Sequence, residues 1–148
     1  TKTTPDGNTE TPVATLEMAL AAGATFIAQG FSTNLQQLTD LFVAAVEHPG
    51  FSLVNVFSPC VTFNKVNTYD WFKERLTDIG TISGYDKNSK GLVLEKALEY
   101  DGLLTGLLYE DGSRKSYEEA SGLASLNRIG EVRKFTPEEF KRLTDDFR

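Results

Sequence analysis

The sequence predicts an α/β fold built on a parallel sheet. Two largely apolar segments, Ala24–Gly30 and Phe51–Phe57, have the composition of strands, and a segment with helical periodicity lies between them. The length of 148 residues is that of one domain. A strand, a helix and a second strand at this spacing form a βαβ unit, because two parallel strands need a crossover connection.

The first predicted helix begins at Thr11-Pro12, an N-cap residue followed by proline at the first helical position. Gly23 ends this helix, since glycine readily adopts the left-handed conformation of a helix C-terminus. The apolar residues of the helix share one face: Val13, Leu16, Ala19 and Leu20.

Asn34 or a neighbouring Ser or Thr caps the second predicted helix. Its stop is His48-Pro49-Gly50, because proline and glycine both oppose helix continuation. The mostly apolar run Phe51–Phe57 predicts a strand buried on both faces. The loop after Phe57 lies at the carboxyl end of this strand, where open α/β sheets place their sites. In the second predicted helix, the apolar residues of the expected buried stripe are Leu38, Leu41, Phe42, Ala45 and Val46.

The second half has a looser pattern. Thr68 caps a predicted helix over 69–76, residues 77–91 are rich in turn formers, and a further helix is expected over 92–100. Leu103–Tyr109 is predicted as a strand that ends at Asp111-Gly112. Two segments fit the capping box, Ser116 with Glu119 and Thr136 with Glu139, and the second opens a helix with an apolar side: Phe140, Leu143 and Phe147.

Composition excludes several classes of function. The net charge of −6 argues against a nucleic-acid partner and against an anionic membrane surface. One cysteine and one histidine cannot form an internal disulfide or a complete Cys/His zinc site. There is no signal peptide and no apolar run long enough for a membrane span, so we expect a soluble, cytoplasmic protein. The first residue is Thr1, from which we expect processing or a piece of a longer chain.

Cys60 is the main candidate for chemistry. Ser58-Pro59 ends the strand in a turn and holds the thiol at the carboxyl edge of the sheet. A buried structural thiol is the commoner role of a lone cysteine, and one ligand of a metal or iron–sulfur site is the alternative. His48 lies at the opposite end of the strand, so a Cys–His catalytic pair is not expected.

Other candidates favour structural interpretations. For the aromatic residues of Tyr69–Lys73, packing is the favoured interpretation and an interface is the second. A plain turn is favoured over a ligand-binding loop at Asp6-Gly7-Asn8. The acidic residues near the C-terminus are expected to form a solvated face rather than a catalytic pair: Glu138, Glu139, Asp145 and Asp146. The sequence has no glycine-rich phosphate loop.

Two strings are distinctive: Gly-Phe-Ser-Leu-Val-Asn-Val-Phe-Ser-Pro-Cys-Val-Thr-Phe-Asn-Lys over 50–65 and Asn-Thr-Tyr-Asp-Trp-Phe-Lys-Glu-Arg over 67–75. Together they resemble the β subunit of 2-oxoacid:ferredoxin oxidoreductases, in particular the 2-oxoglutarate type. Ala22–Ser32 and Thr1–Asn8 also resemble this family, and residues 105–109 and 116–119 do so more weakly. The resemblance covers nearly the whole chain and is strongest in its first half.

The resemblance implies the C-terminal part of a thiamine-diphosphate-binding α/β fold with a helical C-terminal tail. It implies thiamine diphosphate, a magnesium ion and a [4Fe–4S] cluster in the intact protein. Cys60 matches the fourth cluster cysteine of the family, with Ser58 and Pro59 shaping its turn. The implied activity is oxidative decarboxylation of a 2-oxoacid with coenzyme A to acyl-CoA and CO2, with electrons passed through the cluster to ferredoxin.

The sequence departs from the family pattern in what it lacks. The Gly-Asp-Gly motif, the three upstream cysteines and the family's basic substrate contacts are absent, so the chain resembles the C-terminal half of a β subunit. We expect residues 1–76 to complete the thiamine-binding domain and residues 77–148 to form an extension packed on it or on a partner subunit. The expected partners are the α subunit, the N-terminal half of the β subunit and ferredoxin, and the piece alone is expected to be inactive.

Three alternatives stay open at this point. The chain can be a non-catalytic α/β interaction module, or a thiamine enzyme without a cluster in which Cys60 fills the core. It can also belong to a pyruvate-type oxidoreductase, because residues that select the 2-oxoacid lie elsewhere.

Overall fold

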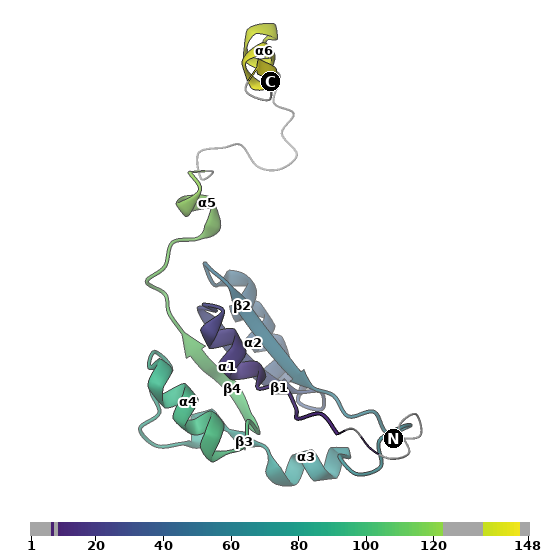
Figure 1. Cartoon of the computed structure of the whole chain (residues 1–148). Coiled ribbons are helices and arrows are strands. Elements are labelled where there is room, and N and C mark those ends of the chain that lie inside the picture. The colour runs from purple at the N-terminus through teal and green to yellow at the C-terminus, as the bar shows by residue number, and fades with distance from the viewer. Residues whose placement is uncertain (1–6, 8, 123–134, 146–148) are drawn as a thin grey trace. The chain divides into compact units, whose positions relative to one another are not determined.

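Four strands form one mixed sheet in the order β2-β1-β4-β3 in the computed structural model, which describes residues 7, 9–122 and 135–145 (Figure 1). The strands are β1 (Phe26–Phe31), β2 (Ser52–Phe57), β3 (Thr77–Asp78) and β4 (Leu104–Glu110). The helices are α1 (Thr15–Ala21), α2 (Leu35–Glu47), α3 (Tyr69–Arg75), α4 (Lys90–Glu99), α5 (Tyr117–Ala120) and α6 (Pro137–Asp145), and a 3-10 turn, η1, covers Ile79–Thr81.

The predicted βαβ unit is confirmed. β1 and β2 pair in parallel, with Phe26 opposite Ser52 and Phe31 opposite Phe57, and α2 is the crossover between them. β4 joins the other side of β1 in the antiparallel direction and carries an irregularity opposite Ile27 and Ala28. β3 pairs in parallel with β4, so the α/β sheet is mixed.

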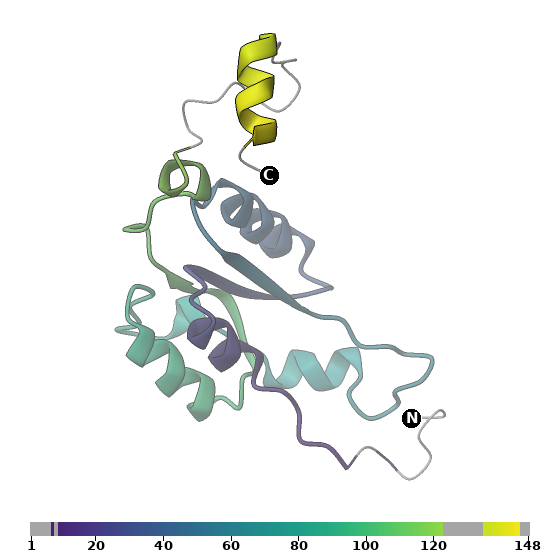
Figure 2. The same ribbon diagram turned by 45° about the horizontal axis from the view of Figure 1, so that its top comes forward.

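Helices cover both faces of the sheet (Figures 1 and 2). α2 packs on β1 and β2 over a small core of Phe26, Ala28 and Leu41. α1 and α4 pack on the opposite face, where the larger core lies: Leu16, Ala19, Leu20, Ala24, Ile27, Ile79, Val93, Ala97, Leu104, Leu108 and Tyr109. Gly106 of β4 has a φ of +105°, and a Cβ there would lie 2.8 Å from Ile79 Cγ2, so this close approach requires glycine.

Local capping signals predict most helix starts correctly. The side chains of Asn34 and Thr68 accept hydrogen bonds from Gln37 N (3.2 Å) and Trp71 N (3.4 Å). Thr136 and Glu139 exchange the two hydrogen bonds of a capping box at the start of α6. Phe147 and the side chain of Leu143 lie outside what the structure describes.

The predicted start of α1 is wrong. The helix begins at Thr15, and its N-cap, Ala14, makes no side-chain capping bond. Val13 lies before the helix and is 68% exposed. The buried residues Leu16 and Leu20 set the helix position instead, because packing stabilises short helices more than capping does. Gly23 ends the helix region with a φ of +84°, as predicted.

The burial of α2 and β2 differs from the prediction. Leu38 and Leu41 are buried, but Phe42 and Val46 are exposed. All six residues of β2 are half-buried rather than fully buried. The reason for the second difference is the sheet order, since β2 forms an edge and no described segment pairs with its outer side.

The contacts divide the chain between Tyr117 and Glu118 rather than after residue 76. Residues 77–117 belong to the first unit because β3 and β4 are strands of its sheet, and β4 lies between β1 and β3. The turn-rich segment 77–91 contains β3 and η1, which its composition does not predict. The second unit, Glu118–Arg148, contains α6 and most of α5.

Candidate functional site

The carboxyl ends of β1 and β2 lie side by side, and Cys60 follows this edge directly. Phe31 is opposite Phe57 in the register, and Ser32 N donates to Phe57 O (2.9 Å) beyond the last pair. Ser58 and Pro59 then lead into a turn, and Cys60 is a free, exposed thiol. The expected position of Cys60 after the strand is therefore present, but the thiol is not the buried core residue that a lone cysteine most often is.

An aromatic cluster fixes α3 against these strand ends. The Phe72 ring lies 5.4 Å from Phe57 and 5.8 Å from Phe31, measured between ring centroids. Tyr69 lies 5.9 Å from Phe31, and Trp71 contacts Phe72 edge-on at 4.9 Å. Aromatic pairs at these distances are favourable, so the packing interpretation of this aromatic segment is confirmed for Tyr69 and Phe72.

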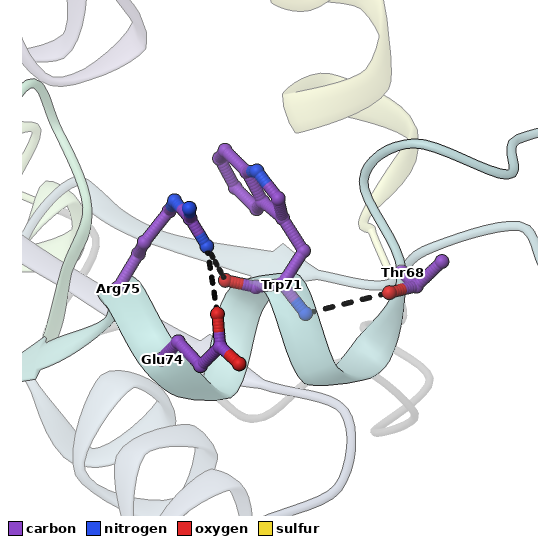
Figure 3. Close-up of polar contacts among 4 residues, drawn as sticks. All are labelled: Thr68, Trp71, Glu74 and Arg75. Carbon is purple, nitrogen blue, oxygen red and sulfur yellow. Dashed lines mark hydrogen bonds and ion pairs between the residues drawn. The ribbon is translucent and has the colours of Figure 1, made fainter.

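The side chains of Trp71 and Arg75 lie side by side on α3 (Figure 3). The Arg75 guanidinium lies 4.7 Å from the centroid of the Trp71 ring and donates to Trp71 O (3.1 Å). It also pairs with Glu74 at 3.2 Å. This cation–π contact orients the indole along the helix toward Arg75.

Asn64 organises the loop between Cys60 and α3. Its side-chain oxygen accepts hydrogen bonds from Val66 N (2.9 Å) and Asn67 N (3.0 Å). Its own backbone N donates to Cys60 O (2.9 Å). The loop therefore has a defined conformation on both sides of Asn64. The signal for it was available in the sequence, because asparagine commonly bonds to backbone groups two and three residues on.

His48 lies at the other end of β2, as predicted. Its Nε2 is 2.8 Å from Thr25 Oγ1, and its ring lies 5.4 Å from the Phe26 ring. The six residues of β2 separate it from Cys60, a span of roughly 20 Å at the rise of an extended chain. A Cys–His pair is excluded by this arrangement.

A buried amide network lies in the same sheet and was not predicted. Gln29 is 2% exposed and donates to Gly102 O (2.9 Å) and Leu104 O (3.0 Å), while its oxygen accepts from Asn55 Nδ2 (2.7 Å). The network borders a cavity of about 390 Å³ between the start of α1 and the end of α4. The three hydrogen bonds satisfy the Gln29 amide, so this residue joins β2, β1 and β4.

The described residues contain no group of three or more His, Cys, Asp or Glu side chains that could hold a metal ion. Cys60 can therefore supply one ligand, and a cluster of the [4Fe–4S] type needs further cysteines. An exposed thiol in an ordered turn fits that role. Of the segment Thr1–Asn8, which resembles the family in sequence, the structure describes Gly7 alone. No described helix is long and apolar enough to span a membrane.

Comparison with known proteins agrees with the fold. Residues 60–124 match the family that describes the C-terminal part of the pyruvate ferredoxin oxidoreductase beta subunit. The chain is 36% identical over 112 residues to the subunit beta of 2-oxoacid:ferredoxin oxidoreductase 2 from Aeropyrum pernix, and the match covers 69% of this chain and 36% of that protein. The chain belongs to the family of 2-oxoacid:ferredoxin oxidoreductase β subunits.

Two further similar proteins carry 2-oxoglutarate in their names. The 2-oxoglutarate synthase subunit KorB of Archaeoglobus fulgidus is 34% identical over 73 residues, covering 49% of this chain and 27% of KorB. A 2-oxoglutarate:ferredoxin oxidoreductase from Magnetococcus marinus, solved with 2-oxoglutarate, coenzyme A and succinyl-CoA bound, has 30% identity and a TM-score of 0.74. The match covers 95% of this chain and 47% of that one, so the chain spans less than half the length of these relatives.

Proposed function

We propose that this chain is the C-terminal part of the β subunit of an enzyme that oxidatively decarboxylates a 2-oxoacid and passes the electrons to ferredoxin. The proposed 2-oxoacid is 2-oxoglutarate. A 2-oxoacid and coenzyme A give acyl-CoA and CO2. The electron pair of the cleaved C–C bond is released as two electrons, and the coenzyme A thiol releases one proton as its sulfur bonds to the acyl carbon. The electrons reduce ferredoxin one at a time. The 2-oxoglutarate names of two relatives support this choice of substrate.

The observation that carries the proposal is the position of Cys60. Its thiol is free and exposed, and it follows the carboxyl end of a parallel strand in a chain of this family. A [4Fe–4S] cluster supplies one-electron transfer when bound, and thiamine diphosphate with Mg²⁺ supplies carbanion stabilisation. In this chain, the Cys60 thiolate would bind one iron, and the Asn64 hydrogen bonds would hold the turn that carries it.

The surroundings of Cys60 support a partner that covers it. Val61 and Phe63 are each 48% exposed and Val66 is 74% exposed. Exposed apolar side chains clustered on one loop indicate a surface that another segment buries. We propose the N-terminal half of the β subunit as that segment, with the other cluster ligands, and the α subunit and coenzyme A as further partners of the assembled enzyme.

The test is Cys60→Ser in the assembled enzyme, with Ser58→Ala as the matched control in the same turn. We expect Cys60→Ser to lower bound iron and acid-labile sulfide and to abolish ferredoxin reduction, whereas Ser58→Ala retains both. Unchanged cluster content in Cys60→Ser would contradict the proposal and favour a thiamine enzyme without this ligand. The 148-residue chain alone is expected to hold no stable cluster, because the described residues supply one cysteine.

A pyruvate-type enzyme is the second candidate, since the description of the matching family names pyruvate as the substrate of the oxidoreductase. Steady-state kinetics of the assembled enzyme with pyruvate and with 2-oxoglutarate decide between them. A higher kcat/KM for pyruvate would replace the first candidate with the second.

A further inference from the structure

Lys65 is the only charged residue of the segment that surrounds Cys60. From Pro49 to Tyr69 the sequence has no other Lys or Arg and no Asp or Glu. This segment contains β2, the turn with Cys60 and the loop that leads to α3. Because 24% of the whole sequence is charged, the position of the single cation in this long uncharged segment is informative.

The Lys65 side chain folds back onto the turn that carries Cys60. Asn64 N donates to Cys60 O (2.9 Å), which closes one helical turn over these residues. Lys65 Nζ donates to the next carbonyl in the chain, Val61 O. The last carbonyls of a helical turn lack partners within the turn, and lysine side chains near such an end can bond to them. The ammonium group is therefore fixed one residue from Cys60.

Backbone geometry limits the distance between the Lys65 ammonium and the cysteine. Consecutive Cα atoms are about 3.8 Å apart, so a group that is hydrogen-bonded to Val61 O lies within roughly 10 Å of Cys60 Cα. Among the described residues, no Asp or Glu forms an ion pair with Lys65, whereas both cations of α3 pair with neighbouring carboxylates. The Lys65 charge is therefore not compensated within the described part of the chain.

Apolar neighbours favour a strong effect of this charge. Val61 and Phe63 are each 48% exposed, Val66 is 74% exposed, and all three lie within four residues of Lys65 in the sequence. A partner that covers these side chains removes water from the loop. Charges that protein separates interact more strongly than charges that water separates, and salt screens them less.

We propose that Lys65 raises the reduction potential of the cluster that Cys60 binds. The inference rests on the proposed function, which supplies the cluster and its redox partners. In the step concerned, one electron from the oxidation of the 2-oxoacid enters the cluster and then leaves to ferredoxin, and no bond to the protein forms or breaks. The electron adds negative charge near the Lys65 ammonium, which therefore stabilises the reduced state more than the oxidised state.

A redox titration of the assembled enzyme, monitored by EPR spectroscopy, tests this inference. Lys65→Met removes the charge and the hydrogen-bond donor, Lys65→Gln keeps a donor without the charge, and Lys65→Arg keeps both. We expect Lys65→Met and Lys65→Gln to lower the equilibrium constant for one-electron reduction of the cluster about tenfold, which is a fall of about 59 mV in potential. Lys65→Arg should retain the original potential, and bound iron and acid-labile sulfide should stay unchanged in all three variants.

Lys87→Met is the matched control, because it removes the same charge at the other end of the sheet. Lys87 is exposed and pairs with Glu110, which lies opposite Phe26 at the start of β1. Cys60 instead follows the carboxyl ends of β1 and β2, and the six residues of β1 span roughly 20 Å. The control should leave the potential unchanged. Equal falls in Lys87→Met and Lys65→Met would assign the effect to net charge and overturn the inference.

The outcomes separate the role of Lys65 from the proposed function. An unchanged potential in Lys65→Met, with the cluster present, would overturn the role of Lys65 and leave the proposed function supported. A fall in Lys65→Met but not in Lys65→Gln would assign the effect to the hydrogen bond and overturn the electrostatic role. Loss of the cluster from both variants would show that Lys65 is needed for assembly and would overturn that role as well. A cluster content that does not depend on Cys60 would contradict the proposed function, and the inference with it.

Discussion

The side-chain amide of Asn55 donates a 2.7 Å hydrogen bond to Gln29, which in turn donates to two carbonyls at the start of β4. This relay crosses three strands that are 26 and about 75 residues apart in the sequence. A buried amide with all its bonds satisfied fixes the relative register of the strands it joins.

Gln29→Leu is expected to destabilise the fold. The variant leaves Gly102 O, Leu104 O and the Asn55 amide without their partner, and the loss of free energy of unfolding should be roughly 2–4 kcal/mol. Urea unfolding measures it. The control is Gln36→Leu on the surface of α2, which removes one exposed hydrogen bond to Asp40 and should change stability by less than about 0.5 kcal/mol. A loss no larger than that of the control would contradict a structural role for the relay.

Phe72→Ala is expected to release α3 from the strand ends. The ring contacts both Phe31 and Phe57, and truncation of a packed Phe costs about 3 kcal/mol. Urea unfolding and near-UV circular dichroism would report the lost stability and the lost aromatic packing. Phe140→Ala, at an exposed position of α6, is the matched control. Retention of the aromatic signal in Phe72→Ala would show that other contacts hold α3.

Asn64→Ala is expected to loosen the loop that carries Cys60. The variant removes the acceptor for Val66 N and Asn67 N, at a cost of about 1 kcal/mol. Hydrogen exchange at these two amides should become faster. Asn64→Asp keeps an acceptor oxygen and should retain the slow exchange. Equal exchange in Asn64→Ala and the unchanged protein would show that the turn does not depend on this side chain.

Tyr85 makes stability depend on alkaline pH. Burial, with a smaller contribution from the nearby Asp86 carboxylate, raises the pKa of Tyr85 to about 12. Its hydroxyl donates to Leu108 O. The raised pKa stabilises the protonated, folded state, so this contribution is complete below about pH 10 and is lost as the pH rises from 10 to 12.

Thermal unfolding between pH 8 and 12 measures this effect, because the ordinary pKa of tyrosine is near 10 and that of Tyr85 in the folded protein is about 12. Tyr85→Phe should lower stability at neutral pH by about 1 kcal/mol and reduce the alkaline decline. A decline of the same size in Tyr85→Phe would assign it to other groups.

Local chemistry in the sequence determined much of this protein. Asn34 and Thr68 start their helices, Gly23 ends one, and the apolar segments around β1 and β2 form the expected βαβ unit. These features depend on neighbouring residues, so they can be predicted from composition and spacing. The position of Cys60 after β2 follows in the same way, because the turn directly follows the strand.

Tertiary structure alone decided the rest. The sequence cannot show that β4 enters the sheet beside β1 in the antiparallel direction, that Gln29 bonds to residues far along the chain, or that β2 lies at an edge. The apolar pattern of β2 predicts a strand buried on both faces. In the described structure β2 pairs with β1 along one edge only, and all six of its residues are half-buried. Burial depends on which segments surround a strand, and residues distant in sequence determine that.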